Sequence, residues 1–419
     1  MTASKSQKST AGFLIFLCWL LYSVSYLGKV NYSANITQII DFYGVSKAEA
    51  GMSPTFFFFA YGIGQVVNGI FCKKYNIRWM IFTSLMTSAV INLIIALSTN
   101  FAIIKWLWMI NGFVLSILWP TLVRLLSESL PQKQLGRSSV IMGTTVATGT
   151  LVIYALSSLY AHFDNFKLSF YTAAIAGGAV SVFWLLWYGK AVKMAKSEAS
   201  DELTEKKQET NIVDEKVNQT KNEKKLFFTC IYVLCFFAIG VNLIKDGLTT
   251  WVPSILKEEY HMADSLSILL TLLLPIVAVF GNLCALSMHK KIPDYVTHCG
   301  VVFAIILGFI GIIIGSISFD MVVIMLAGLV IVNFLASSLN SLITSIFPIF
   351  MRGKVNSGLY AGVLNGFCYL GSTLSSYGLG IIADNWGWIA VFEFLMAFCA
   401  VICIVWFGYG VYKKILKQQ

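Results

Sequence analysis

Two lysines lie inside apolar stretches of this chain, where charged side chains are rare. Lys29 falls in an apolar run that begins near residue 11, and Lys245 falls in another that begins near residue 226. A lysine at the centre of a bilayer costs at least about 2.5–3.5 kcal/mol on insertion scales, so it usually faces a bundle interior or a water-filled cavity. Two cations facing one cavity would bind an anion. The structural alternative is that each lysine snorkels to the membrane surface.

Polar side chains accompany the first lysine at helical spacing. Tyr22, Tyr26, Lys29 and Ser33 recur at intervals of three or four residues. On a helix these positions form one continuous polar face. The pattern predicts that this face lines an aqueous cavity.

The residues around the second lysine repeat this arrangement. Asn242 and Thr249 stand on either side of Lys245 at the spacing seen around the first lysine, so the two stripes match at one constant offset along the chain. Asp246 follows directly and projects about 100° around the helix from Lys245. We expect Asp246 either to neutralise the lysine when the site is empty or to accept a proton.

The composition is that of a membrane protein. Of the 419 residues, 57% are hydrophobic and only 12% are charged, whereas soluble proteins carry about 25% charged residues. Apolar runs of about twenty residues, each enough to cross ~30 Å of hydrocarbon, recur from end to end. The predicted fold class is an all-α membrane protein with twelve transmembrane helices. The predicted spans are 11–33, 50–71, 79–98, 101–127, 137–160, 168–190, 226–250, 265–288, 296–317, 321–347, 355–382 and 387–411.

The net charge of +10 is distributed over alternate loops. By the positive-inside rule this places both termini in the cytoplasm, and we expect a multi-pass protein of the inner or plasma membrane. A nucleic-acid partner is not expected, because the bases do not form one patch. The basic loops carry Lys73, Lys74, Arg78, Lys133, Arg137, Lys290, Lys291, Arg352 and Lys354.

The apolar pattern is interrupted once, at residues 191–225. This segment is rich in charged and amide residues and nearly lacks large apolar ones, so we predict a flexible cytoplasmic linker. It divides the chain into an N-terminal six-helix bundle, residues 1–190, and a C-terminal six-helix bundle, residues 226–419.

Catalytic chemistry is not indicated. The nine cysteines lie in or beside apolar spans without the spacing of metal ligands and are interpreted as small buried hydrophobes. The sequence has no nucleophile–base pair and no phosphate-binding loop of the known motifs. We therefore expect no enzyme activity, no cofactor and no metal.

The Phe56–Phe59 run is expected to face lipid or the protein core. Other spans carry polar stripes as well. These stripes suit a cavity wall, although close packing of small polar residues between helices explains them equally well. They comprise Tyr61, Gln65 and Asn68 in the second span, Asn333, Ser337, Asn340 and Thr344 in the tenth, and Asn365, Tyr369, Ser372 and Ser376 in the eleventh.

The two halves resemble each other beyond the lysines. A proline, a glycine five residues later and then a base follow the fourth span, and the same pattern follows the tenth. Two six-helix repeats about an axis normal to the membrane are the layout of the major facilitator fold.

Several motifs resemble the organophosphate:phosphate antiporter family of the major facilitator superfamily, which includes the glycerol-3-phosphate and hexose-6-phosphate transporters. The first span has Tyr22-x3-Tyr26-x2-Lys29-x-Asn31, where the family has Tyr-x3-Tyr-x2-Arg-x-Asn. The seventh has Lys245-x5-Trp251-x-Pro253, similar to the family's Arg-x5-Trp-Ser-Pro. The resemblance implies a substrate site built from Lys29, Lys245, Tyr22, Tyr26, Asn31, Tyr61 and Tyr369.

The sequence departs from the family pattern at its charged positions. Both signature arginines are lysines, and lysine binds phosphate as a point charge rather than through a bidentate fork. The fifth-span histidine of the glycerol-3-phosphate carriers is replaced near Val146, and a second-span lysine corresponds to Gln65.

The resemblance predicts a monomeric secondary transporter that exchanges a phosphorylated metabolite for inorganic phosphate by rocker-switch alternating access. One alternative is a proton-coupled symporter of a sugar acid or other carboxylate, which Asp246 keeps open. A second is a transporter-like membrane sensor of an organophosphate. The expected partners are a small anion, inorganic phosphate or a proton, and the lipid bilayer.

Overall fold

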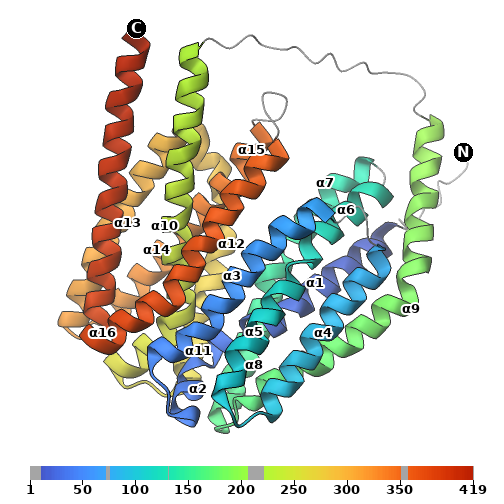
Figure 1. Cartoon of the computed structure of the whole chain (residues 1–419), viewed down its shortest axis with the longest axis horizontal. Coiled ribbons are helices and arrows are strands. Elements are labelled where there is room, and N and C mark those ends of the chain that lie inside the picture. The colour runs from blue at the N-terminus through green and yellow to red at the C-terminus, as the bar shows by residue number, and fades with distance from the viewer. Residues whose placement is uncertain (1–10, 72–75, 131, 206–220, 351–356, 419) are drawn as a thin grey trace, which may run out of the picture.

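The computed structural model describes residues 11–71, 76–130, 132–205, 221–350 and 357–418, and helices joined by short turns fill these ranges (Figure 1). Four of the basic loop residues discussed above, Lys73, Lys74, Arg352 and Lys354, therefore lie outside the described residues. The all-α membrane fold predicted from the composition is confirmed.

The helices of the first half run from α1 to α9. In chain order they are α1 (Ala11–Ala34), α2 (Ile36–Tyr43), α3 (Lys47–Phe71), α4 (Ile77–Leu97), α5 (Phe101–Leu115), α6 (Leu118–Ser129), α7 (Gln132–Gly143), α8 (Thr145–His162) and α9 (Lys167–Glu205). The second half continues with α10 (Lys221–Tyr260), α11 (Asp264–Thr271), α12 (Leu273–Lys291), α13 (Tyr295–Ser318), α14 (Val322–Ser341), the π-helical turn η2 (Leu342–Ile346), α15 (Phe347–Phe350) and α16 (Ser357–Gln418).

Ten described helical stretches are long and apolar enough to cross a membrane. One of them, Gly362–Leu416, has 55 residues and as a straight helix would measure about 80 Å, far more than the ~30 Å hydrocarbon core. The chain instead turns at Gly387, whose φ of 79° and ψ of 179° suit a residue without a Cβ. This break makes two spans of α16. The 25-residue α3 has the length of a span, although it is not one of these ten stretches; counted with it, the described helices agree in number with the twelve predicted spans.

Glycines allow two equivalent helix contacts, one in each half. A Cβ atom added at Gly149 of α8 would lie 2.1 Å from the carbonyl oxygen of Ser23 in α1. A Cβ atom at Gly371 of α16 would lie 2.1 Å from the carbonyl oxygen of Ile239 in α10. Ser23 precedes Lys29 by six residues and Ile239 precedes Lys245 by six. The two lysine-bearing helices are thus packed in the same way.

Helix extends into both ends of the predicted linker. α9 continues to Glu205 and α10 begins at Lys221, while residues 206–220 lie outside the described residues. The division of the chain at residues 191–225 stays a prediction.

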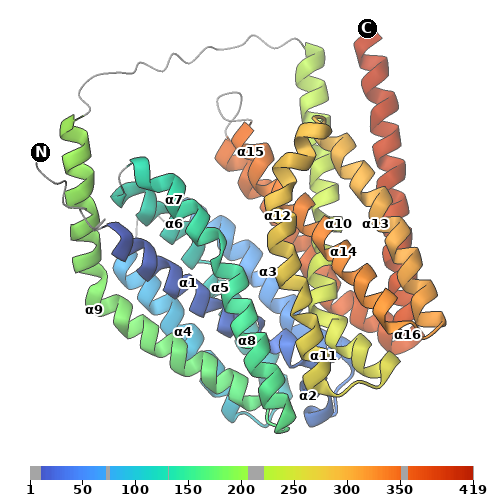
Figure 2. The ribbon, with the colours of Figure 1, turned by 180° about the vertical axis from the view of Figure 1, so that it is seen from behind.

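The two halves lie side by side and are closest at one end (Figures 1 and 2). We call this end the closed face; it carries α2 and α11. The other end, here the terminal face, is where α1 and α10 begin and where α9 and α16 end. Toward the terminal face the helices of the two halves diverge.

Candidate functional site

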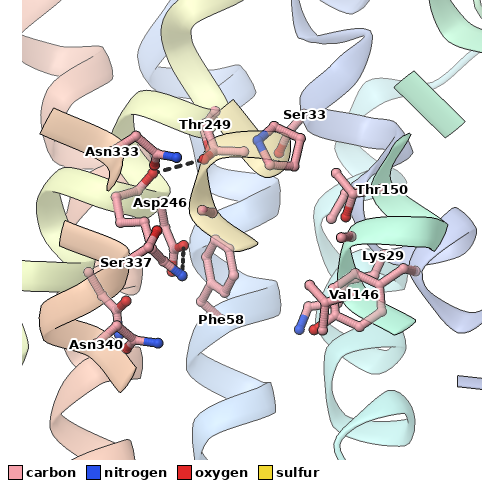
Figure 3. A pocket seen from close by; sticks show the side chains of 18 of the residues that line it. Lys29, Ser33, Phe58, Val146, Thr150, Asp246, Thr249, Asn333, Ser337 and Asn340 are labelled. Atoms are coloured by element: carbon pink, nitrogen blue, oxygen red, sulfur yellow. Dashed lines mark hydrogen bonds and ion pairs between the residues drawn. The ribbon is translucent and has the colours of Figure 1, made fainter. Parts of the chain in front are cut away.

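A cavity of about 320 Å³ lies between the two halves. Figure 3 shows side chains from both halves directed into it, with Lys29 and Asp246 on opposite sides. The first half contributes Tyr26, Lys29, Val30, Ser33, Pro54, Phe57, Phe58, Trp108, Gly143, Val146, Ala147 and Thr150. The second contributes Asn242, Lys245, Asp246, Thr249, Thr250, Pro275, Ala278, Val279, Asn282, Asn333, Ser337, Asn340, Asn365 and Tyr369.

The ammonium group of Lys29 lies among aromatic rings. Its Nζ atom is 4.0 Å from the centroid of the Tyr61 ring and 4.9 Å from that of Tyr26. A third ring, Phe57, is 5.8 Å away. Such contacts are attractive because the ring face is electronegative, but they do not cancel the charge. Within the described part of the chain, Lys29 has no carboxylate at ion-pair distance.

Lys245 has a different environment. Its Nζ atom lies 3.0 Å from Oδ1 of Asp246, and the hydroxyl of Ser372 donates a hydrogen bond to the other oxygen of that carboxylate. Ser372 is held on α16, so the carboxylate is fixed between two helices. Among the described lining residues, the charged side chains are two lysines and one aspartate, so together they carry a net positive charge.

Five of the predicted site residues line the cavity, and a sixth, Tyr61, contacts the lining residue Lys29. The lining residues are Tyr26, Lys29, Lys245, Asp246 and Tyr369. Tyr61 contacts Lys29 as described, and its ring also packs on the Tyr369 ring with centroids 4.9 Å apart. This contact joins the two halves beside the cavity.

Tyr22 and Asn31 are placed differently. The buried Tyr22 ring packs against Trp119, with centroids 5.0 Å apart, one helical turn beyond Tyr26. The Asn31 amide is fully buried and donates a hydrogen bond of 2.8 Å to Oδ1 of Asn92 in α4. Neither is among the lining residues. Their roles in binding stay predictions.

Sequence reasoning missed the aromatic part of the wall. Phe57 and Phe58 line the cavity with Trp108, although the phenylalanine run was expected to face lipid or core. The Phe56–Phe59 run contains no polar residue that would identify the side of the helix facing the aqueous cavity. The rings of Phe57 and Tyr61 stack with centroids 5.7 Å apart, and the polar stripe through Tyr61 was the available signal.

At the closed face, a carboxylate of the second half binds the start of a helix of the first half. Asp384 of α16 accepts hydrogen bonds from the backbone N–H groups of Lys47 and Ala48, of 3.1 and 2.7 Å. These groups open α3, so the carboxylate also meets the positive end of that helix dipole. The ammonium of Lys47 lies 3.0 Å from a carboxylate oxygen of Glu258 in α10.

A second cluster of charges lies on the same face. Lys257 of α10 donates hydrogen bonds to Asp41 in α2 and to Asp264 at the start of α11. The first of these joins the two halves. No local sequence pattern indicates the contact between Lys257 and Asp41, because these two residues lie far apart in the chain.

Hydrogen bonds between the halves continue from this face to the cavity. The Tyr154 hydroxyl donates to the carbonyl of Thr249, and the Ser158 hydroxyl donates to the carbonyl of Ser265. Along α8 these residues lie beyond the lining residue Thr150 on the closed-face side. The cavity is therefore closed on that side, and the halves separate toward the terminal face (Figure 2).

The family model described as Major Facilitator Superfamily matches residues 18–361. A probable hexose phosphate transport protein of Chlamydia muridarum is 23% identical over 408 residues, covering 92% of this chain and 88% of that protein. The membrane sensor protein UhpC of Escherichia coli is 21% identical over 404 residues, covering 90% and 87%.

The fold is also that of a solved transporter structure. A bacterial homologue of the human lysosomal transporter Spinster, in an inward-facing and occupied conformation, matches with a TM-score of 0.74 and 12% identity, covering 97% of this chain and 98% of that one. At this identity the likeness shows the fold alone. The family match and the curated relatives confirm the resemblance inferred from the motifs, and this chain belongs to the major facilitator superfamily.

Proposed function

We propose that this transporter carries a small phosphorylated metabolite, a sugar phosphate or glycerol phosphate, in exchange for inorganic phosphate. The observation that carries the proposal is Lys29, a cation that lines the cavity without a carboxylate beside it in the described part of the chain. A phosphate group would supply the missing negative charge. The hexose phosphate transport protein among the relatives supports the same substrate class.

The proposed mechanism follows from the placement of the two lysines. An anion between Lys29 of α1 and Lys245 of α10 would draw the halves together, because each lysine belongs to a different half. In a dehydrated cavity such attraction is several times stronger than in water. Binding would thus favour a rocking motion that opens the closed face and shuts the terminal face. Without an anion, the uncompensated charge would disfavour that motion, which is the basis of obligatory exchange.

The proposal includes the orientation in the membrane. With both termini in the cytoplasm, as the basic loops indicate, the conformation described here is open to the inside. We propose a monomer in the inner or plasma membrane, because the cavity is formed within one chain.

A second candidate function is proton-coupled symport of a carboxylate. The observation that favours it is Asp246, a carboxylate inside the cavity that pairs with Lys245. Protonation of Asp246 would free that lysine for a substrate carboxylate. Sensing without transport is a third outcome, in keeping with the sensor among the relatives.

The deciding experiment is uptake by proteoliposomes that contain the purified protein. Vesicles loaded with inorganic phosphate are compared with empty vesicles, and each is tested with and without a pH gradient. The external compounds are radiolabelled phosphate, glycerol 3-phosphate, hexose 6-phosphates and hexonates. The exchange proposal expects uptake of a phosphorylated compound only into phosphate-loaded vesicles. Hexonate uptake into empty vesicles driven by the pH gradient would contradict it and support the symporter.

A further inference from the structure

Three buried oxygen atoms in the cavity wall have no hydrogen-bond partner. Among the described residues, the side-chain oxygens that are buried, unpaired and part of the lining are Asn242 Oδ1, Asn333 Oδ1 and Ser337 Oγ. All three belong to the second half. Their side chains are at least nine-tenths buried, with 4%, 2% and 2% of their surfaces exposed. Buried polar atoms are normally paired, so this cluster points to a ligand or to water that a ligand replaces.

The orientation of the Asn333 amide is determined by its other end. Its Nδ2 atom donates a hydrogen bond of 2.7 Å to the carbonyl of Leu274 in α12. The donor is thereby used and the acceptor, Oδ1, is left for the cavity. The residue therefore offers an acceptor to whatever occupies this space.

Ser337 lies one helical turn along α14 from Asn333, so the two side chains share a face (Figure 3). Hydroxyls on cavity helices often bond to their own backbone, as Thr249 does to the carbonyl of Lys245 and Thr344 to that of Asn340. Ser337 makes no such bond. Its hydroxyl is free to donate to or accept from a ligand.

The two unpaired amide oxygens of this wall disfavour the phosphate end of a substrate and favour hydroxyl groups. Amide oxygens accept hydrogen bonds, and a phosphate presents almost only acceptors, so the two repel each other. Hydroxyl groups donate and fit such a wall. The facing first half supplies the rings of Phe57, Phe58 and Trp108, which suit the apolar C–H face of a sugar.

We propose that Asn242, Asn333 and Ser337 form a hydroxyl-binding subsite, so that the transported anion carries several hydroxyl groups on an organic body, as a sugar phosphate does. The phosphate lies at the lysines and the hydroxyls face α10 and α14. This inference rests on the proposed function, which supplies the anionic end. It adds that inorganic phosphate, which has no organic body, leaves this subsite to water.

The test compares two phosphates of equal charge on the detergent-purified protein. Dissociation constants for hexose 6-phosphate and for cyclohexylmethyl phosphate, which has a ring but no hydroxyls, are obtained from ligand-dependent thermal unfolding. We expect the wild type to bind the hexose phosphate at least tenfold more tightly. Ser337→Ala and Asn242→Ala should each reduce this preference about tenfold. The matched control is Ser338→Ala, on the same helix but bonded to the sulfur of Met288 and not part of the lining.

Equal binding of the two phosphates by the wild type would overturn the subsite, as would an unchanged preference in both variants. Singly deoxygenated hexose 6-phosphates repeat the test without any substitution. At least one should bind the wild type about tenfold more weakly, and uniform binding across the set would overturn the proposal. Loss of phosphate-dependent exchange with the preference intact would contradict the proposed function and leave the subsite standing.

Discussion

Lys245 holds its ammonium nitrogen 3.0 Å from Oδ1 of Asp246, the next residue in the chain. The two lysines that the sequence singles out are thus not equivalent in the conformation described here. Lys245 is neutralised by an internal carboxylate, whereas Lys29 lies near three aromatic rings and has no carboxylate at ion-pair distance among the described residues. The cavity offers one uncompensated positive charge, and a second becomes available when Asp246 is displaced or protonated.

Replacing Asp246 by asparagine should strengthen anion binding. The substitution keeps the size of the side chain and leaves Lys245 without its carboxylate, so the site gains one net positive charge. At an effective dielectric constant of 20, a charge about 4 Å away contributes roughly 4 kcal/mol before desolvation is counted. We expect the KM for inorganic phosphate in phosphate:phosphate exchange to fall about tenfold.

The same variant separates the two candidate functions. If the protein is an exchanger, Asp246→Asn retains exchange, although slower release can lower its maximal rate. If the protein is a proton symporter, accumulation driven by a pH gradient disappears. Ser372→Ala is the companion variant, because it removes the hydrogen bond to Asp246 without changing the charge. A rise in KM for Asp246→Asn would contradict this view of the pair.

Asp384→Asn should weaken the closed face. The carboxylate bonds two backbone N–H groups at the start of α3 and lies near Lys47. Hydrogen bonds to a charged acceptor contribute about 1.5–3 kcal/mol each, and an amide retains only part of this. We expect roughly a tenfold increase in the population open at the closed face.

The measurement is the rate at which a membrane-impermeant thiol reagent, applied from the closed-face side, labels a cysteine introduced at the lining residue Ser33. Asp320→Asn is the matched control, because Asp320 lies in the turn between α13 and α14 on the same face and has no ion pair among the described residues. Equal labelling rates in both variants would show that Asp384 does not hold the face closed.

Gly149→Ala should destabilise the first half. The added methyl group would lie 2.1 Å from the Ser23 carbonyl oxygen and 2.6 Å from the Tyr26 Cβ atom, so α1 and α8 must move apart. Overpacking of this kind costs about 1–3 kcal/mol. The midpoint of thermal unfolding in detergent should therefore fall, as it should for Gly371→Ala in the second half.

Gly178→Ala, in contrast, should not lower the stability of the protein. Apart from its own stretch of α9, no described part of the chain lies within 4 Å of a Cβ at this position, so the methyl group only favours the helix, by up to about 1 kcal/mol. Its unfolding midpoint should stay level or rise. A fall as large as that of Gly149→Ala would contradict the steric explanation.

The fold was predictable because its main signal is local. A membrane span is recognised in the sequence as a run of about twenty apolar residues. Lys29 and Lys245 are conspicuous because each interrupts such a run. The angular position of Asn31 was also available from the sequence. It lies two residues from Lys29, about 200° around the helix, and the structure accordingly directs it to Asn92 and away from the cavity.

The closed face could not be predicted in the same way. Lys47 meets Glu258 and Asp384, which lie hundreds of residues away in the chain and in the other half. No periodicity links them, because their contact depends on how the halves tilt. For Asp246, two roles were expected: neutralising Lys245 or accepting a proton. The sequence could not decide between them, because the helical angle between neighbouring residues does not determine where the end of a long lysine side chain lies.

The most direct test of the account concerns the charge at residue 29. Uptake of hexose 6-phosphate into phosphate-loaded proteoliposomes is measured for the wild type, Lys29→Arg and Lys29→Gln. The account predicts that arginine retains exchange, because its guanidinium binds phosphate through two parallel hydrogen bonds, and that glutamine lowers kcat/KM at least a hundredfold. Exchange by Lys29→Gln at the wild-type rate would contradict the anion site at the centre of this account.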